Sequence, residues 1–179
     1  MPTVLPGVRV RLIKKEGDKE YILMVLEETN KAALLDPGQP SKIRWRIPGG
    51  KVGDLLGGNS EESPFEAVGR ELLEENHLKA DVSSDPVMDV EYVNSDGLER
   101  KVLVFNATNP RPCAESLGPD HRVLDFNWFL LETVFGELFS EKYGKSFPIA
   151  KRHISYIHLI NNPQLKDRPF KKIEIKAPA

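Results

Sequence analysis

The stretch from Ser63 to Asn76 constrains the fold more than any other part of the chain, because its residues specify where a helix begins. Ser63 can cap the helix, and Glu66 three residues later completes a capping box. Pro64 falls at the first helical position, where its missing N–H group costs nothing. The sequence therefore predicts a helix from Pro64 to about Asn76.

This helix carries two stripes of different chemistry when its side chains are placed at about 100° per residue. The apolar stripe, which we expect to face a sheet, consists of Phe65, Val68 and Leu72. The acidic stripe is related by i+3 and i+4 spacings and consists of Glu71, Glu74 and Glu75. Arg70 and Glu66 are expected on the side of the helix away from the acidic stripe.

The acidic stripe has two interpretations. Like charges at this spacing cost about 0.2–0.5 kcal/mol per pair, which a solvated helix tolerates, and the run RELLEE is common on protein surfaces. A divalent cation could instead use the stripe, since Mg²⁺ binds carboxylate oxygens. Pro48, Gly49 and Gly50 lie upstream, and glycines let a backbone approach a ligand closely. A glycine loop combined with an acidic helix face predicts a metal and phosphate site.

Strand patterns dominate the rest of the chain. Strands are predicted at residues 7–14, 21–26, 43–47, 87–93, 101–106 and 123–129, the first two as a hairpin. Loops are predicted at 28–43 and 108–120, and further helices near 131–139 and 146–160. This order of elements indicates an α/β (α+β) fold in which helices pack on a mixed sheet.

Composition and charge place few limits on function. The 179 residues fit a single domain, 1–179, and a hydrophobic content of 40% allows a sizeable core. The net charge of −2 is uneven, because seven basic and two acidic side chains give residues 150–179 a charge of +5. A solvated basic C-terminal segment explains this pattern, and contact with phosphates or RNA is the alternative.

Cysteine usage and hydropathy suggest where the protein works. Cys113 is the only cysteine, so no disulfide within the chain is expected, which suits a reducing compartment. The first residues lack the apolar run of a signal peptide, and no stretch has the length of a transmembrane helix. We therefore expect a cytoplasmic protein with no membrane contact, while its oligomeric state is left open.

The glycine loop and the acidic helix together resemble the Nudix box, the signature of the Nudix hydrolases. The matching residues are Gly50, Glu62, the run Arg70-Glu71-Leu72-Leu73-Glu74-Glu75, and Leu78. Seven residues separate Glu62 from Arg70, as in the family pattern, and Trp45 resembles part of the usual lead-in. The resemblance covers about thirty residues and implies a Nudix-like αβα sandwich, a mixed sheet with helices on both faces.

Two features depart from the family pattern. Eleven residues, in place of five, separate Gly50 from Glu62, and we place the extra residues within Gly53–Ser60. Such an insertion lengthens a loop at small thermodynamic cost, so we expect the helix to keep its position. His77 stands where the family has a glycine, at a position that often requires a left-handed backbone. We expect strain at His77 without loss of the fold, and metal ligation by His77 is the less favoured reading.

The resemblance implies a metal site at the acidic stripe. The metal ligands would be Glu71, Glu74 and Glu75, with Glu75 central, together with a backbone oxygen of Gly49 or Gly50. The implied cofactor is Mg²⁺ or Mn²⁺. The implied activity is hydrolysis of a diphosphate linkage in a nucleoside diphosphate-linked, nucleotide-like small molecule.

The resemblance also implies supporting roles for other box residues. Glu71 would orient or deprotonate the attacking water, and Glu62 would support the metal cluster or its waters. Arg70 would pair with a carboxylate and hold the loop in place. Family members often add an acid from a later loop, and the candidates are Asp120 and its neighbour Glu115, although both can equally be ordinary loop acids.

Other function classes find less support in the sequence. No Gly-Lys-Ser/Thr ending supports a P-loop ATPase, and one cysteine with four scattered histidines gives no zinc spacing. The main alternative is a catalytically silent Nudix-fold nucleotide-binding or regulatory module, which loss of box glutamates would favour, but none is lost. An isomerase of the same fold would need a catalytic cysteine, and Cys113 has no matching motif. The substrate is left open, because the loops that would select it carry no recognised motif.

Overall fold

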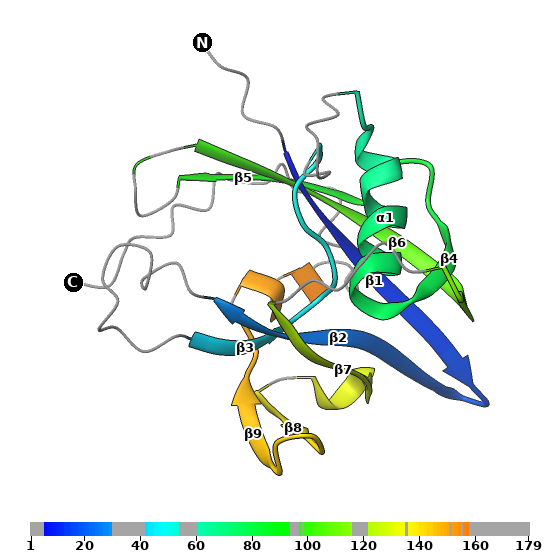
Figure 1. Ribbon diagram of the computed structural model, residues 1–179, viewed down its shortest axis with the longest axis vertical. Coiled ribbons are helices and arrows are strands. Elements are labelled where there is room, and N and C mark those ends of the chain that lie inside the picture. The colour runs from blue at the N-terminus through cyan, green and yellow to red at the C-terminus, as the bar shows by residue number, and fades with distance from the viewer. Residues whose placement is uncertain are drawn as a thin grey trace.

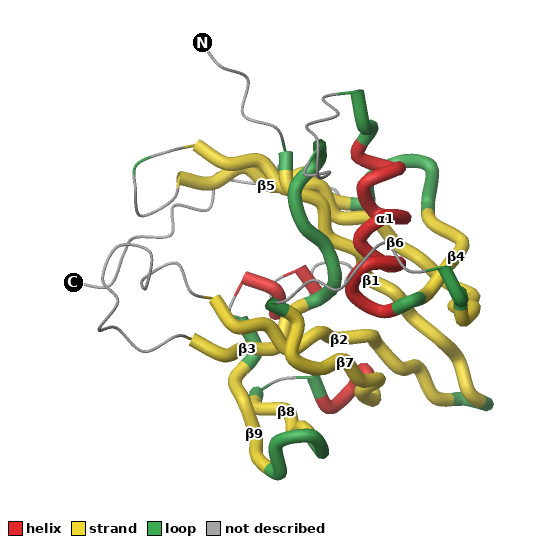
Figure 2. Tube along the Cα trace, viewed as in Figure 1, coloured by secondary structure: helices red, strands yellow, loops and turns green. Residues whose placement is uncertain are grey.

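The computed structural model describes residues 6–29, 42–53, 61–93, 97, 99–115, 122–134, 136–150, 152–154 and 156–157. Within these ranges a seven-stranded sheet carries one long helix, α1, and a two-stranded sheet projects from one end of the molecule (Figures 1 and 2). The helix spans Pro64–Asn76, within the bounds that the capping signals predict. The fold class predicted from the sequence is confirmed.

The strands follow each other closely along the chain. They are β1 (Gly7–Glu16), β2 (Lys19–Thr29), β3 (Lys42–Arg46), β4 (Leu78–Val82), β5 (Met88–Val93), β6 (Glu99–Pro112), β7 (Val123–Leu130), β8 (Glu137–Ser140) and β9 (Lys145–Pro148). A short 3₁₀ turn, η1, spans Leu131–Thr133. A second helical segment lies at 152–154 and 156–157.

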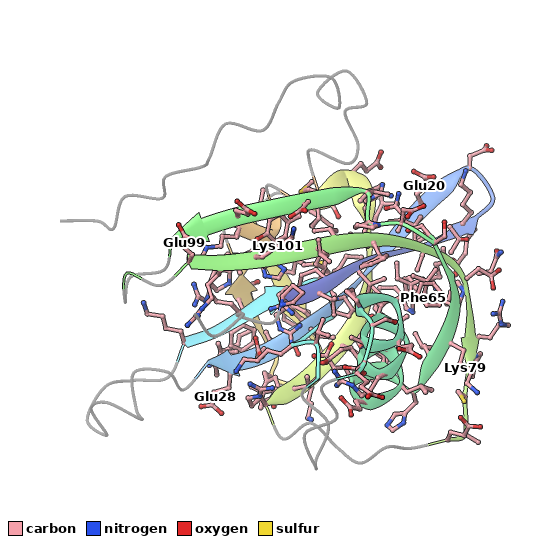
Figure 3. The ribbon with its side chains drawn as sticks, turned by 90° about the horizontal axis from the view of Figure 1, so that it is seen from above. Glu20, Glu28, Phe65, Lys79, Glu99 and Lys101 are labelled. Atoms are coloured by element: carbon pink, nitrogen blue, oxygen red, sulfur yellow. The ribbon has the colours of Figure 1, made fainter. Side chains whose placement is uncertain are left out.

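The large sheet is mixed because one central pair of strands is parallel. Its order is β3-β2-β1-β6-β4, with β7 also paired to β2 and β5 also paired to β6. Strands β1 and β6 run parallel from Gly7 opposite Val102 to Leu12 opposite Ala107, and the other pairs are antiparallel. Strand β6 is long enough to pair with β5 along its first half and with β4 along its second. Figure 3 accordingly shows Glu99 and Lys101 far from Lys79 of β4.

Several sequence predictions of secondary structure are confirmed. The predicted hairpin is formed by β1 and β2, which pair from Ile13 opposite Ile22 to Glu16 opposite Lys19. Strands also occur at the four other predicted places, as β3, β5, β6 and β7. Residues 28 and 29 extend β2, and 42 and 43 begin β3, while the rest of the predicted 28–43 loop lies outside the described residues.

Other predictions of secondary structure are wrong. Strand β4 has no counterpart among the predicted strands, and residues 108–112 extend β6 where a loop is predicted. Both differences arise because β4 and β6 pair with each other. The helix predicted near 131–139 is replaced by η1 and β8. The helix predicted at 146–160 is in part β9, and helical residues begin only at 152. The apolar spacing in these short stretches fits strands as well as helices.

The sheet separates two hydrophobic clusters. One lies under α1 and includes Val8, Val10 and Leu12 of β1 together with Val68 and Leu72 of the helix. The other cluster lies on the opposite face, where Tyr156 and Ile157 of the second helical segment pack with residues of β2, β3, β5 and β6. Helical structure on both faces therefore covers the sheet.

One predicted member of the apolar stripe does not face the sheet. Phe65 is 47% exposed, whereas Ala67, Val68 and Leu72 are buried (Figure 3). Phe65 lies in the first turn of α1, and the helix buries the face that includes Ala67 in its place. Among the helices of the described residues, none has the length and apolar character needed to cross a membrane.

Candidate active site

Both ends of α1 are fixed by local contacts, which sets the position of the acidic stripe. The Ser63 side chain accepts from the Glu66 N–H at 3.2 Å, and the Glu66 carboxylate accepts from the Ser63 N–H at 2.8 Å. At the other end His77 adopts φ 53° and ψ 42°, the left-handed conformation expected of the family glycine. Histidine thus occupies this position with the fold intact, as expected.

Arg70 gathers three glutamates of the box around one guanidinium group. Its Nε donates to Glu62 at 2.7 Å, and its Nη1 donates to Glu71 at 2.9 Å and to Glu74 at 2.8 Å. The expectation that Arg70 lies away from the acidic stripe is therefore wrong. The reason is that a long arginine side chain reaches the carboxylate four residues ahead on the helix.

The same arginine ties the helix to the loop that precedes it. Its Nη2 donates to the carbonyl oxygen of Lys51 at 2.8 Å, next to Gly50. Glu62 accepts from the Gly53 N–H at 2.7 Å, so it bridges the loop and Arg70. Four residues predicted for the site, Glu62, Arg70, Glu71 and Glu74, are thus in one network.

Glu75 belongs to a second network, centred on Arg46 at the end of β3. Arg46 donates to Glu75 at 2.5 Å and to Glu27 of β2 at 2.6 Å. Arg46 also donates to the carbonyl oxygen of Gly49 at 2.8 Å, and Glu75 accepts from the Gly49 N–H at 3.1 Å. The helix and the glycine loop are therefore joined at Glu75 as well as at Arg70.

The glycines of the loop are required by close contacts. A Cβ atom on Gly50 would overlap the carboxylate of Glu71, and a Cβ on Gly49 would overlap the carbonyl oxygen of Val8. Gly49 also has φ 137°, a conformation that other residues rarely adopt. The backbone at Gly50 thus lies directly against Glu71, which is the close approach that the glycine loop predicts.

The electrostatics of the acidic stripe favour a bound cation. Burial raises the pKa of Glu71 to about 7, and repulsion from Glu75 adds to this effect, while Arg70 opposes it. Burial also raises the pKa of Glu75 against the attraction of Arg46. Negative charge is therefore disfavoured on two neighbouring carboxylates, and a cation placed among them would relieve that cost.

The donor chemistry of this stripe fits a hard divalent cation, although its oxygens are not gathered for one. Carboxylates and backbone carbonyls are the ligands that Mg²⁺ and Mn²⁺ take. Within the described ranges, however, no group of three or more His, Cys, Asp or Glu side chains has the arrangement of a metal site. The physical reason is that Arg46 and Arg70 pull the carboxylates toward themselves.

Sequence reasoning did not find Arg46, Glu27, Arg9 or His153 as members of this region. Attraction from Glu75 and Glu27 outweighs burial and raises the pKa of Arg46. His153 of the second helical segment accepts from the Ile47 N–H at 3.1 Å. Burial, and then the positive charge of Arg9, lower the pKa of His153, so it is neutral. The one hint in the sequence was the position of Arg46, two residues before Pro48. Its carboxylate partners Glu27 and Glu75 lie far from it in the sequence, so no local spacing pattern connects them.

The other predicted site features lie at the edge of this region or outside the described residues. Glu115 is exposed and pairs with Lys79 at 3.0 Å. Figure 3 shows Lys79 at the outer edge of the sheet. Asp120 lies outside the described residues, as does most of the Gly53–Ser60 insertion. The exposed side chain of His77 points to a capping role at this position.

Comparisons of whole structures identify the fold. The chain is similar to the NUDIX domain of Shewanella oneidensis NrtR complexed with ADP ribose, with 17% identity and a TM-score of 0.56 over 90% of this chain and 88% of that one. It is similar to a MutT NUDIX hydrolase from Burkholderia pseudomallei, with 20% identity and a TM-score of 0.55 over 87% and 97% of the two chains.

A NUDIX hydrolase from Nitrosomonas europaea gives the same result, with 16% identity and a TM-score of 0.54 over 94% of this chain and 99% of that one. No family model and no curated protein matches the sequence. At these identities the likeness concerns architecture, so the chain has the Nudix fold, as the box residues predict.

Proposed function

We propose that this protein is a Nudix hydrolase that cleaves a diphosphate linkage in a nucleoside diphosphate-linked substrate. The observation that carries the proposal is the position of the acidic stripe. Glu71 and Glu75 are buried on α1, against the backbone of Gly49 and Gly50, in a chain with the Nudix fold. The alternative interpretation, a solvated stripe, would place these carboxylates in water, where like charges are screened.

The cofactor in this proposal is Mg²⁺ or Mn²⁺. Its ligands would be Glu71, Glu74 and Glu75 with a backbone oxygen of Gly50. When bound, the cation would neutralise the diphosphate and acidify water for attack on phosphorus. Support comes from the hard oxygen donors and from the raised pKa values of Glu71 and Glu75, since both favour a cation at this place.

The chain's own residues would hold and orient the reacting groups. Glu71, whose pKa is about 7, is suited to accept a proton from the attacking water near neutral pH. Arg70 and Glu62 act as positioning residues, because they tie α1 to the loop carbonyl of Lys51 and the N–H of Gly53. Arg46 positions Glu75 and the Gly49 carbonyl in the same way.

The second candidate is a Nudix-fold module that binds a nucleotide without hydrolysing it. The specific observation in its favour is that both arginines engage the carboxylates, which leaves no converged metal site within the described part of the chain. The two candidates share a ligand class, since one structure of similar fold was solved with ADP ribose.

A hydrolysis panel tests the proposal. The full chain is incubated with ADP-ribose, ADP, a nucleoside triphosphate and a dinucleoside polyphosphate, each with Mg²⁺, with Mn²⁺ and with chelator, and products are followed by phosphorus NMR. The proposal expects metal-dependent cleavage of a diphosphate linkage in at least one compound. Binding without any cleavage would support the silent module, and neither binding nor cleavage would contradict both candidates.

Placement in a reducing, cytoplasmic setting stays a prediction. It is based on Cys113, a half-buried free thiol. The suggestion that the basic segment contacts RNA also stays a prediction, because residues 158–179 lie outside the described part of the chain.

A further inference from the structure

Arg9 of β1 lies beside the glycine loop of the candidate site. The N–H groups of its two neighbours, Val8 and Val10, donate to the carbonyl oxygens of Gly50 at 2.9 Å and Pro48 at 3.0 Å. The loop therefore runs alongside β1 like an added strand, with Arg9 next to Gly49. The contact is close, because a Cβ on Gly49 would lie 2.9 Å from the Cα of Arg9.

The environment of Arg9 differs from that of the two other arginines near the site. Arg46 and Arg70 each bind at least two carboxylates. The hydrogen bond that Arg9 donates goes to the neutral carbonyl oxygen of Val8 at 3.0 Å, and none of the ion pairs in the described ranges includes Arg9.

The charge of Arg9 is held under unfavourable conditions. Arg9 is partly buried, so its guanidinium group can still be reached from solvent. This burial, and then repulsion from Arg46, lower the pKa of Arg9, although Glu75 and Glu27 attract it. Moving a cation out of water without a partner is costly, and a fold that needed only bulk here could use an apolar side chain of similar length. A charge that is retained next to a site in spite of this unfavourable free energy indicates a ligand whose binding compensates for it.

The chemistry of a guanidinium group defines that ligand. Arginine presents a planar fork of donors that matches the oxygens of a phosphate and can bind two of them at once. Glu75 and Glu71 attract the positive charge of Arg9 and therefore lie near it. An anion bound by Arg9 would thus lie close to the acidic stripe. A diphosphate held there would be contacted from the sheet by Arg9 and from the helix by the carboxylate site.

We propose that Arg9 is a substrate-binding residue that holds non-bridging oxygens of the diphosphate beside the Gly49–Gly50 loop. This inference rests on the proposed function, because it assigns the substrate's phosphates to that site. It has a second consequence, since the cost of the partly buried charge falls on the protein without ligand. Replacing Arg9 with methionine should weaken binding and leave the unliganded protein equally stable or more stable.

The test measures binding of a non-hydrolysable diphosphate, α,β-methylene-ADP, to the full chain in Mg²⁺ by calorimetry. The variants are Arg9→Met, Arg9→Lys, which keeps the charge but loses the fork, and Arg111→Met. Arg111 is a matched control for net charge, because it is exposed and pairs with Asp81. Melting temperatures of all four proteins are measured without ligand.

We expect the dissociation constant to rise about tenfold or more in Arg9→Met and severalfold in Arg9→Lys, and to stay within twofold in Arg111→Met. The melting temperature of Arg9→Met should equal or exceed that of the wild type. Unchanged binding by both Arg9 variants would overturn the inference, as would a wild type that does not bind the analogue. A lower melting temperature with unchanged binding would assign Arg9 a structural role.

These outcomes separate the inference from the proposed function. Hydrolysis by the wild type together with normal analogue binding by the Arg9 variants would refute only the inference. Analogue binding that depends on Arg9, in a protein that hydrolyses nothing, would refute the hydrolase and keep Arg9 as the anion-binding residue of a silent module.

Discussion

Arg46 and Arg70 divide the carboxylates of the candidate site between them. Arg70 forms ion pairs with Glu62, Glu71 and Glu74, and Arg46 forms one with Glu75. Each arginine also donates to a loop carbonyl, so charge pairing and loop position are coupled in both networks. Because both guanidinium groups are buried among carboxylates, removal of either arginine would leave uncompensated negative charges.

At the residue scale, Glu71 should make stability depend on pH in an uncommon direction. Its pKa of about 7 in the folded protein exceeds the ordinary glutamate value of 4.5, so the folded state binds more protons between these two values. Its contribution is therefore complete below about pH 4.5 and is lost as the pH rises through about 7. The difference corresponds to about 3 kcal/mol of unfolding free energy.

The measurement is urea unfolding of the wild type and of Glu71→Gln between pH 5 and 8, with chelator present. Comparing the two proteins cancels titrating groups that do not interact with Glu71, such as His153, whose lowered pKa destabilises the fold at acidic pH. The coupled titration of Glu75 is part of the measured difference, because repulsion between Glu71 and Glu75 is lost in the variant. We expect the wild type to lose stability relative to the variant as the pH rises. Parallel pH curves would contradict the burial of an ionisable Glu71.

At the element scale, α1 is the part of the molecule that the sequence predicts best. Its start depends on Ser63, Pro64 and Glu66, which act on each other over three residues, and its end depends on His77. Such signals are readable because they are local. The shorter elements β4, β8 and β9 were missed, since pairing with distant strands decides them and four or five residues show no distinct period.

His77 should carry a measurable backbone cost at the end of α1. A left-handed conformation costs a residue with a Cβ about 1 kcal/mol more than glycine, and His77 has φ 53°. We expect His77→Gly to raise the free energy of unfolding by about this amount, measured by urea denaturation. The contrasting variant His77→Val should lower it, because a β-branched side chain is poorly tolerated there. Equal stability of the three proteins would mean that the strain is absorbed elsewhere.

At the scale of the whole molecule, the second helical segment is hydrogen-bonded through His153 to Ile47, the residue that follows β3. His153 accepts from the Ile47 N–H, 106 residues away in sequence. Ile47 leads directly into the Pro48–Gly50 loop, so this bond links the far face of the sheet to the candidate site. No spacing rule could reveal this contact, which explains why sequence reasoning found the box residues but not His153, Arg46 or Arg9.

Replacing His153 tests this connection. In His153→Phe the Ile47 N–H would be buried without an acceptor, which should lower the free energy of unfolding by about 1–3 kcal/mol. Hydrogen exchange at Ile47 should become faster as well. His153→Asn is the matched control, because its side-chain oxygen can take the place of Nδ1. Unchanged exchange at Ile47 in the phenylalanine variant would argue against the bond.

The central claim is that the buried carboxylates of α1 carry out a metal-dependent hydrolysis. Glu75 is the most informative of them, since it joins the helix, Arg46 and the Gly49 backbone. Glutamine keeps the shape of Glu75 and can still accept from the Gly49 N–H, so the variant should fold. Its loss of charge relieves repulsion with Glu71 but also removes a partner of Arg46.

The most direct measurement compares the Mg²⁺-dependent rate of diphosphate hydrolysis in the wild type, in Glu75→Gln and in Glu115→Gln, with folding checked by circular dichroism. The account predicts metal-dependent turnover in the wild type, a loss of about a hundredfold or more in Glu75→Gln, and an unchanged rate in Glu115→Gln. A folded Glu75→Gln variant that keeps the wild-type rate would contradict the account, as would a wild type that cleaves no diphosphate.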